Sequence, residues 1–508
     1  MSTETHSAGL PCGRAAPAPP DTAGVEWLID NANAYRALIG AIRRAGATIW
    51  ITQLALDTDC VAYDVAGAGE AGVRIVDELL EAARRGVEVR VLLNASLLLD
   101  TASTLRRYLA AAGAGRVRMR VRGVRRFPQL LHAKMVIVDE TMAFLVGSPF
   151  ANGYWDDARH HPRDARRPMR ELGGRPVHDV STRLIGDAAR TLAATFAELW
   201  NDADDVAPDD TERLPATASQ RQDALSPVVV VRTGPGDEGP IEILPALLDG
   251  ISTARQTIYI EHQYLSSRPV VDALRRAVAA HEALELVVVL NQNPDVTAYR
   301  GWQNDRLREA GLLDHPRVGL FTIWTSAAAP RGRRRINQVF VHSKVVLIDD
   351  RWALVGSANL DGVSLHSYGD DFTGVLGRRL FREVRNFDVN VVVTTDDAGV
   401  HGVVRRLRTG LWDEHLGSAF DGAEERPLGG WLPLWRTVAA DNADALNSRD
   451  RAACGGRSLI LPYSACPTPS AQLADIGVLL APGTIELCFN PSWLEVRFSP
   501  NWVRNMFA

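Results

Sequence analysis

Two copies of one short pattern contain the residues of this sequence best suited to chemistry. The first copy runs from Leu131 to Asp139 and the second from Val341 to Asp349. Each consists of His, any residue, Lys, four apolar residues and Asp, and each is followed by a Gly-Ser pair. A single His-x-Lys is common on a strand, but two copies at one constant offset indicate a functional pair.

The residue types favour an anionic substrate, because each motif places an imidazole beside a fixed ammonium group. Residues 135–138 and 345–348 are apolar runs with β-branched side chains, as in strands buried on both faces. Side chains two residues apart on a strand point the same way, so His132 and Lys134 should share one side. The alternative is an edge strand with a solvated lysine and a capping histidine, and the repeat weighs against it.

Helices and strands alternate ahead of each motif, which predicts an α/β fold with a parallel or mixed sheet. In the first half we expect helices at 35–45, 72–85 and 101–112 and strands at 48–51, 87–93 and 117–124. In the second half we expect helices at 241–255, 270–280 and 304–311 and strands at 257–261, 284–290 and 318–324. The matching order predicts an internal duplication of about 200 residues that forms two pseudo-symmetric α-β-α sandwich lobes, each with a mixed central sheet.

Composition divides the chain into five parts. We expect a disordered tail at 1–24, a first catalytic lobe at 25–200, a linker at 201–227, a second catalytic lobe at 228–417 and a C-terminal extension at 418–508. The extension carries Trp431, Trp435, Trp493 and Trp502 among prolines and glycines. We expect these rings to pack the extension onto the lobes, and the alternative is a lip that faces lipid or substrate.

Charge and cysteine usage restrict the setting. The net charge of −5 disfavours nucleic acid as a partner. No apolar run is long enough for a transmembrane helix, and the tail lacks the apolar segment of a signal peptide. The five cysteines form no close pair, so neither a zinc site nor a disulfide framework is indicated. A cytoplasmic location is expected, with export by a route that needs no signal as the alternative.

The repeated pattern resembles the His-Lys-Asp signature of the phospholipase D superfamily, and the likeness covers about residues 25–416. The stretch 258–264, Ile-Tyr-Ile-Glu-His-Gln-Tyr, resembles one in phospholipases D but has His262 where the family has Asn. The stretch 407–417, which contains Leu-Trp-Asp-Glu-His-Leu-Gly, resembles the corresponding stretch of bacterial phospholipases D. Both favour lipid enzymes, closest to bacterial phospholipase D and cardiolipin synthase-like proteins, over nucleases. For His262, a surface position at a strand end is expected, with a third catalytic histidine as the alternative.

The resemblance implies that both motifs meet at the lobe interface, where His132, Lys134, His342 and Lys344 form one site. One imidazole would attack phosphorus and form a phosphohistidine, and the other would protonate the leaving alcohol and then activate water or an acceptor alcohol. We assign the attack to His132 and the acid–base role to His342, and the reverse assignment stays open. The lysines would hold phosphate oxygens. No metal and no cofactor are expected.

Other residues would support this chemistry. By position, Asp179 and Asp388 match the acids that orient the histidines, and strand-end turns are the alternative role. The motif acids Asp139 and Asp349 complete the catalytic signature, although in the family they usually hold structure away from the phosphate. Turn hydroxyls and amides would line the phosphate pocket; these are Ser148, Asn152, Ser357 and Asn359.

Two arginine-rich runs, 116–126 and 331–335, precede the motifs. They would dock anionic headgroups or nucleic acid, or else form a solvated strand face. His160 and His161 lie in a polar, basic loop after the first motif and are expected to be exposed to solvent.

The leading hypothesis is a phosphoric diester hydrolase of the phospholipase D type that acts on glycerophospholipids, with transfer of the phosphatidyl group to alcohols as a second activity. We expect a monomer that contacts the membrane surface transiently. The alternatives are a cardiolipin synthase-like phosphatidyltransferase, a nuclease of the same superfamily, and a lipid-binding protein without activity. Two complete His-x-Lys pairs argue against the last alternative.

Overall fold

A computed structural model describes residues 24–488, except for 68, 97–98, 114–117, 127, 169–171, 208–209, 211, 216–225, 237–238, 373–374, 397–401, 421–424, 448–457 and 480–484. The predicted tail before Gly24, the centre of the predicted linker, Trp493 and Trp502 therefore lie outside the described residues.

The first lobe is built on a mixed sheet of eight strands, in the order β1-β11-β9-β8-β2-β5-β6 with β7 paired to β5. Strands β2, β5 and β7 are parallel, and the strands on the β8 side are antiparallel. The elements are β1 (Val25–Ile29), α1 (Asn31–Arg44), β2 (Thr48–Gln53), β3 (Val61–Ala62), β4 (Val73–Arg74), α2 (Ile75–Arg84), β5 (Glu88–Ser96), β6 (Leu99–Asp100), α3 (Thr101–Ala111), β7 (Met119–Val124), β8 (Met135–Val138), β9 (Met142–Leu145), η2 (Asn152–Tyr154), η3 (Leu172–Gly174), β10 (Val177–His178), β11 (Val180–Ile185) and α4 (Asp187–Asn201).

The second lobe repeats this order as β12-β20-β19-β18-β13-β14-β15, with β16 and β22 added beyond β15 and β21 paired to β15. The predicted fold class, two α/β lobes with mixed sheets, is confirmed. The elements are β12 (Val228–Thr233), α5 (Ile243–Thr253), β13 (Thr257–His262), α6 (Arg268–Ala280), β14 (Glu285–Leu290), α7 (Thr297–Glu309), β15 (Val318–Ala328), η4 (Pro330–Gly332), β16 (Arg334–Gln338), β17 (Phe340–Val341), β18 (Lys344–Ile348), β19 (Trp352–Gly356), α8 (Gly362–Leu365), η5 (Tyr368–Asp371), α9 (Val375–Leu380), β20 (Asp388–Thr394), α10 (Val403–Leu416), η6 (Gly417–Ala419), α11 (Leu432–Asn447), β21 (Ser458–Pro462), α12 (Pro469–Asp475) and β22 (Ile485–Leu487).

The motif strands separate two apolar layers. In β8, Met135 and Ile137 face a core that continues into the second lobe, whereas Val136 and Val138 face the core under α1, α2 and α3. This alternation is the expected consequence of the strand period of two. The shared core contains apolar residues of β18, β20, α4 and α10, so the inner faces of both sheets are buried together.

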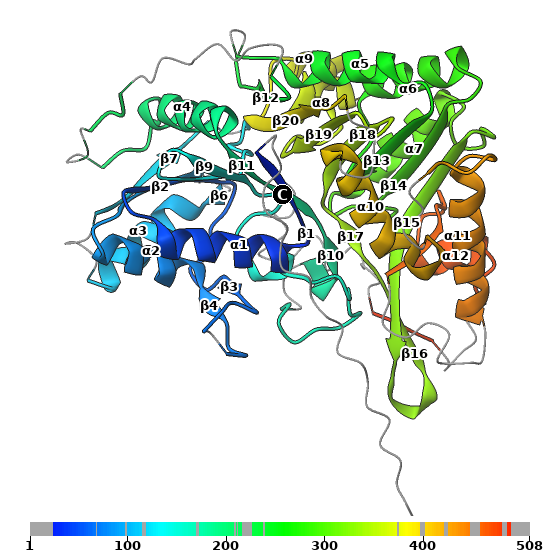
Figure 1. Cartoon of the computed structure of the whole chain (residues 1–508), viewed down its shortest axis with the longest axis horizontal. Coiled ribbons are helices and arrows are strands. Elements are labelled where there is room, and N and C mark those ends of the chain that lie inside the picture. The colour runs from blue at the N-terminus through cyan, green and yellow to red at the C-terminus, as the bar shows by residue number, and fades with distance from the viewer. Residues whose placement is uncertain are drawn as a thin grey trace, which may run out of the picture.

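The last helix of each lobe also contacts the first strand of the other lobe. Helix α10 packs near β1, where the Trp27 Nε1–H donates a 2.9 Å hydrogen bond to the Val403 carbonyl, and α4 packs against β12. Figure 1 shows the lobes side by side, with α11 and α12 of the extension on the outer side of the second lobe.

The described part of the extension packs onto the second lobe, as expected. Trp431 and Trp435 are buried, and the Trp435 ring lies 5.3 Å from that of Trp412. Strand β21 pairs with β15, and β22 pairs with β16. For these two tryptophans, the alternative of a lipid-facing lip is therefore wrong.

Several arginines of the two runs form ion pairs inside the chain. Arg122 forms a 2.8 Å ion pair with Asp210 of the predicted linker, and Arg125 pairs with Asp205. In the second run, Arg335 pairs with Glu486 at 3.2 Å. These contacts favour a structural role over the docking of polyanions. Within the described ranges, no helix combines the length and apolar character needed to cross a membrane.

Candidate active site

Backbone contacts bring the two motifs together at the lobe interface. The His132 N–H donates a 3.0 Å hydrogen bond to the Phe387 carbonyl, and the His342 N–H donates a 2.8 Å bond to the His178 carbonyl. Strand β10 of the first lobe pairs in parallel with β17 of the second. Both histidines precede their motif strands rather than lying within them, which the sequence pattern did not predict.

Each imidazole binds a carboxylate of the opposite lobe. His132 Nδ1 lies 2.7 Å from Asp388 Oδ1, and His342 Nδ1 lies 2.9 Å from Asp179 Oδ2. An acceptor at Nδ1 fixes the tautomer and the orientation of each ring. The two acids proposed from the sequence thus lie beside the histidines, but each acts across the interface.

The motif lysines lie under the same interface. The Lys134 Nζ donates to the His132 carbonyl at 2.8 Å, and the Lys344 Nζ donates to the His342 carbonyl and lies 3.1 Å from His342 Nδ1. Burial and the charge of Lys344 together lower the pKa of Lys134 to about 7. Burial lowers the pKa of Lys344 to about 8. The charge of one buried ammonium group disfavours the charge of the other, and a bound anion relieves this repulsion.

Both histidines are held in the neutral form. Burial and the charge of Lys134 lower the pKa of His132. Burial and the charge of Lys344 lower the pKa of His342 to about 3. The paired carboxylates oppose these shifts. Each side chain of the four motif residues is at most 2% exposed.

The Gly-Ser turns support the orienting acids. The Ser148 hydroxyl donates to Asp179, and the Ser357 hydroxyl donates to Asp388 Oδ1 at 2.7 Å. A Cβ added at Gly147 would lie 2.0 Å from Asp179 Oδ1, so only glycine admits this close approach. Ser148 Oγ also lies 3.3 Å from His342 Nδ1, and the role of both serines in a phosphate pocket stays a prediction.

The two predicted asparagines differ. The Asn152 amide donates to the Asp59 carbonyl and its oxygen accepts from the Val61 N–H, so this side chain holds a neighbouring loop. Asn359 is buried, and its Oδ1 has no hydrogen-bond partner among the described residues. Asn31, which the sequence did not single out, donates a 2.9 Å hydrogen bond to Ser148 Oγ.

The motif acids lie at the far ends of their strands. Asp139 accepts hydrogen bonds from the backbone of residues 46–48, and Asp349 accepts them from residues 255–257. Strands β8 and β18 separate them from the histidines. This placement favours the structural role and not direct catalysis.

Two expectations about histidines are wrong. His262 is not a surface residue: it is 1% exposed and lies opposite Lys344 in the β13–β18 pairing. His160 is fully buried, whereas His161 is exposed as predicted. The sequence could not show either position, because the partners come from distant segments.

Sequence reasoning also missed two groups of side chains whose geometry could hold a metal ion. Asp30, His160, His178 and Glu414 form one, and His178, Glu261 and His415 form the other. Their donor atoms lie within 4.8 Å of one another in each group. Glu261, Glu414 and His415 lie in the two stretches noted for their resemblance to phospholipases D, which was the available signal.

Known proteins resemble the chain over much of its length. Phospholipase D A of Dictyostelium discoideum is 26% identical over 348 residues, 56% of this chain and 27% of that protein. Cardiolipin synthase B of Escherichia coli (strain K12) is 26% identical over 373 residues, 72% of this chain and 81% of that protein. The chain thus spans only about a quarter of phospholipase D A.

A solved structure gives the same fold. Phosphatidylserine synthase of Haemophilus influenzae Rd KW20 matches with a TM-score of 0.50 at 13% identity, over 77% of this chain and 86% of that one. A family model described as "Cardiolipin synthase, PLD-like domain" matches residues 38–152 and 247–394, just over half of the chain. With both His-x-Lys motifs inside the matched segments, the chain belongs to this phospholipase D-like family.

Proposed function

We propose that the chain is a phospholipase D-type phosphodiesterase that hydrolyses glycerophospholipids to phosphatidate and a free headgroup. The observation that carries the proposal is the reciprocal pairing of His132 with Asp388 and of His342 with Asp179. Two neutral imidazoles, each oriented from the opposite lobe, suit a displacement at phosphorus that needs a nucleophile and a proton donor.

In the first step, His132 Nε2 attacks phosphorus and the bond from phosphorus to the headgroup oxygen breaks. Protonated His342 gives its proton to the leaving oxygen. The free site holds His342 neutral, so the bound phosphodiester must supply the negative charge that raises its pKa. Lys134 and Lys344 stabilise the charge that develops on the phosphate oxygens.

In the second step, His342 takes a proton from water, and the resulting nucleophile attacks the phosphohistidine. The bond from phosphorus to His132 Nε2 breaks, which releases phosphatidate and restores both rings. A primary alcohol in place of water gives the phosphatidyl alcohol by the same steps. Hydrolysis and transfer therefore differ only in the acceptor.

Helix α9 supports a transient contact with the membrane surface. Val375, Leu376 and Leu380 are 83%, 72% and 66% exposed, which is unusual for apolar side chains so close together. Arg378 and Arg379 are exposed in the same helix. We call these five residues the α9 patch, and it lies in the segment between Asn359 and the orienting Asp388. Apolar side chains beside arginines suit an anionic lipid surface.

The second candidate is a cardiolipin synthase-like phosphatidyltransferase. The match to cardiolipin synthase B covers 81% of that protein, far more than the match to phospholipase D A covers. A nuclease is disfavoured by the net charge of −5 and by the ion pairs that several arginines of the two runs form within the chain. The cytoplasmic location and the monomeric state stay predictions.

The deciding experiment incubates the chain with a panel of phospholipid vesicles, with and without a primary alcohol. Phosphatidate alone supports hydrolysis, phosphatidyl alcohol supports transfer, and cardiolipin from phosphatidylglycerol supports the second candidate. Cleavage of DNA with no lipid product would reject the lipid assignment.

A trapping experiment assigns the two histidines. With a labelled phosphodiester whose leaving group needs no proton, His342→Ala should accumulate labelled phosphate on His132, because the attack proceeds without the proton donor while the second step is blocked. Label on His342 in His132→Ala would establish the reverse assignment. Circular dichroism of both variants controls for folding.

A further inference from the structure

Away from the paired imidazoles, four buried side chains point donor atoms at one small volume. They are Asp30 Oδ1, His160 Nε2, His178 Nδ1 and Glu414 Oε1, which we call the buried tetrad. The first three come from the first lobe and Glu414 comes from α10 of the second. Asp30, His160 and His178 are at most 1% exposed, and the Glu414 side chain is 9% exposed.

The spacing of these atoms fits a tetrahedral metal ion. His160 Nε2 lies 2.9 Å from Glu414 Oε1 and 3.6 Å from Asp30 Oδ1. His178 Nδ1 lies 2.9 Å from Glu414 Oε1 and 3.1 Å from Asp30 Oδ1. Zinc bonds of about 2.0–2.2 Å place neighbouring donors of a tetrahedron about 3.3–3.5 Å apart. The four separations lie within about 0.6 Å of this tetrahedral spacing, and all the donor atoms lie within 4.8 Å of one another.

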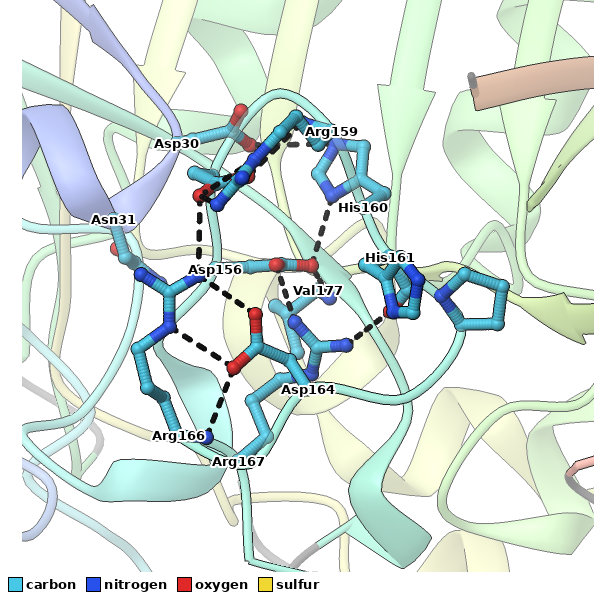
Figure 2. A network of polar contacts seen from close by, with 12 residues as sticks. Asp30, Asn31, Asp156, Arg159, His160, His161, Asp164, Arg166, Arg167 and Val177 are labelled. Carbon is cyan, nitrogen blue, oxygen red and sulfur yellow. Dashed lines mark hydrogen bonds and ion pairs between the residues drawn. The ribbon is translucent and has the colours of Figure 1, made fainter. Parts of the chain in front are cut away.

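Carboxylates hold the opposite nitrogens of both histidines. His160 Nδ1 lies 2.9 Å from Asp156 Oδ2, and Asp156 also binds Arg167 and the Val177 N–H. Figure 2 shows Asp156 between His160 and Arg167, with Asp30 on the other side of the His160 ring. His178 Nε2 lies 2.9 Å from Glu261 Oε1. Metal-binding histidines typically have such a carboxylate on the second nitrogen.

The second carboxylate oxygen of Asp30, next to the donor atom of the tetrad, is unsatisfied within the part of the chain that the structure describes. Asp30 Oδ2 is buried and has no hydrogen-bond partner among the described residues. We propose that the buried tetrad binds a divalent transition-metal ion of the Zn²⁺ class. Two imidazoles with two carboxylates suit Zn²⁺, and four protein ligands leave no open position, as in structural sites.

The ion would join the lobes directly behind the paired imidazoles. His178 precedes Asp179, which orients His342, and its carbonyl accepts the His342 N–H. An ion held by His178 and by Glu414 would fix this segment against the second lobe. The site is structural and independent of the proposed reaction, so either can fail without the other.

The test uses the full chain with a purification tag that lacks histidine. After dialysis against a chelator, Co²⁺ is added and the visible spectrum is recorded. A buried tetrahedral ion should give intense d–d absorption that saturates at one equivalent and disappears on addition of Zn²⁺. A folded chain without this absorption would overturn the proposal and leave an imidazolium–carboxylate network in its place.

Two neighbouring histidines provide the matched comparison. His160→Gln removes a ligand and should abolish the absorption, whereas His161→Gln, at an exposed position, should retain it. If His160→Gln does not fold, Glu414→Gln replaces it, with the same expected loss. Asp156→Asn should weaken Co²⁺ binding about 10–100-fold. Equal absorption and affinity in the wild type and in folded ligand variants would overturn the assignment of the site.

Discussion

The paired imidazoles have matching partners but different surroundings. Both lysines donate to the backbone carbonyl of the histidine in their own motif. Lys344 Nζ also lies 3.1 Å from the imidazole nitrogen His342 Nδ1. Burial and Lys134 lower the pKa of His132, so in the proposed reaction this ring need not lose a proton before it attacks. The lysines therefore have two effects: they stabilise the phosphate charge and keep the nucleophile neutral.

Lys134→Met tests both effects at once. Loss of the ammonium should lower kcat/KM about 10²–10³-fold, as for removal of one charge-stabilising donor. It should also raise the pKa of His132, since Lys134 lowers that pKa in the intact site. The acid limb of the kcat/KM profile, where His132 becomes protonated, should then move to higher pH. A limb that stays fixed or moves to lower pH would contradict the proposed coupling.

At this scale the sequence predicted the reactive side chains better than their partners. The four motif residues lie together, and the repeat marks them directly, whereas Asp179 and Asp388 were assigned only by position. Asn152 and His160 were misplaced, since their contacts with Val61 and Glu414 depend on how loops fold over distant elements. A short pattern contains no information about such contacts.

Each motif strand connects a reactive end to a structural end. Asp139 accepts hydrogen bonds from the N–H groups of Gly46, Ala47 and Thr48 at 3.0, 2.8 and 2.9 Å. These N–H groups lie where the chain leaves α1 and enters β2, and β2 pairs with β8. Partial burial raises the pKa of Asp139, but the three hydrogen bonds outweigh it and hold the pKa below 3.8.

Asp139→Asn should therefore reduce stability and leave the chemistry nearly intact. The amide offers one acceptor instead of a charged carboxylate, so about 1–3 kcal/mol of unfolding free energy should be lost. Because the folded pKa is depressed, this stabilisation is present above pH 3.8 and is lost as pH falls through the folded pKa. Urea unfolding at neutral pH measures the loss, with exposed Glu140→Gln as the control. A large fall in kcat with unchanged stability would restore the catalytic role of Asp139.

Helix α9 has no buried side chain among its described residues, so its exposed leucines can be replaced with little effect on the fold. Leu376→Ser and Leu380→Ser should weaken binding to anionic vesicles, because each leucine contributes about 1.5–3 kcal/mol when buried in lipid. Cosedimentation with vesicles of neutral and anionic lipid measures this binding. Leu479→Ser is the matched control, since Leu479 is 75% exposed but lies in the extension. Turnover of a soluble short-chain substrate should not change, and equal loss of vesicle binding in all three variants would reject α9 as the contact.

At the scale of elements, periodicity predicted most helices and strands of the two lobes. Strands β1 and β12 were missed, although they begin the two sheets, because each is a short run next to a composition break. Helix α1 begins at Asn31, four residues before the predicted start, since buried Asn31 and Ala32 lack helical apolar spacing. Local sequence pattern alone therefore misses the edge strands β1 and β12 at which the two sheets begin.

The whole molecule is a duplicated fold whose halves share one interior. The sheets have the same strand order, and a single apolar core contains residues of β8, β18, α4 and α10. The sequence predicted the duplication, but the exchange of α4 and α10 between lobes depends on packing over distances that local periodicity does not encode. At the candidate active site, the His132–Asp388 and His342–Asp179 pairs also cross the interface.

Shared packing should make the two lobes unfold together, although proteins of this size often show separate transitions. Ile39→Ala tests this, because Ile39 is fully buried in a core cluster that belongs to the first lobe alone. The cavity should cost about 2–5 kcal/mol, and amide protection in β14 of the second lobe should fall by the same free energy. Hydrogen exchange measured strand by strand gives the comparison, with calorimetry to count transitions. If β14 kept full protection while β2 and β5 exchanged faster, the lobes would be independent, and the cross-lobe imidazole pairs could not rely on a common core to hold them in register.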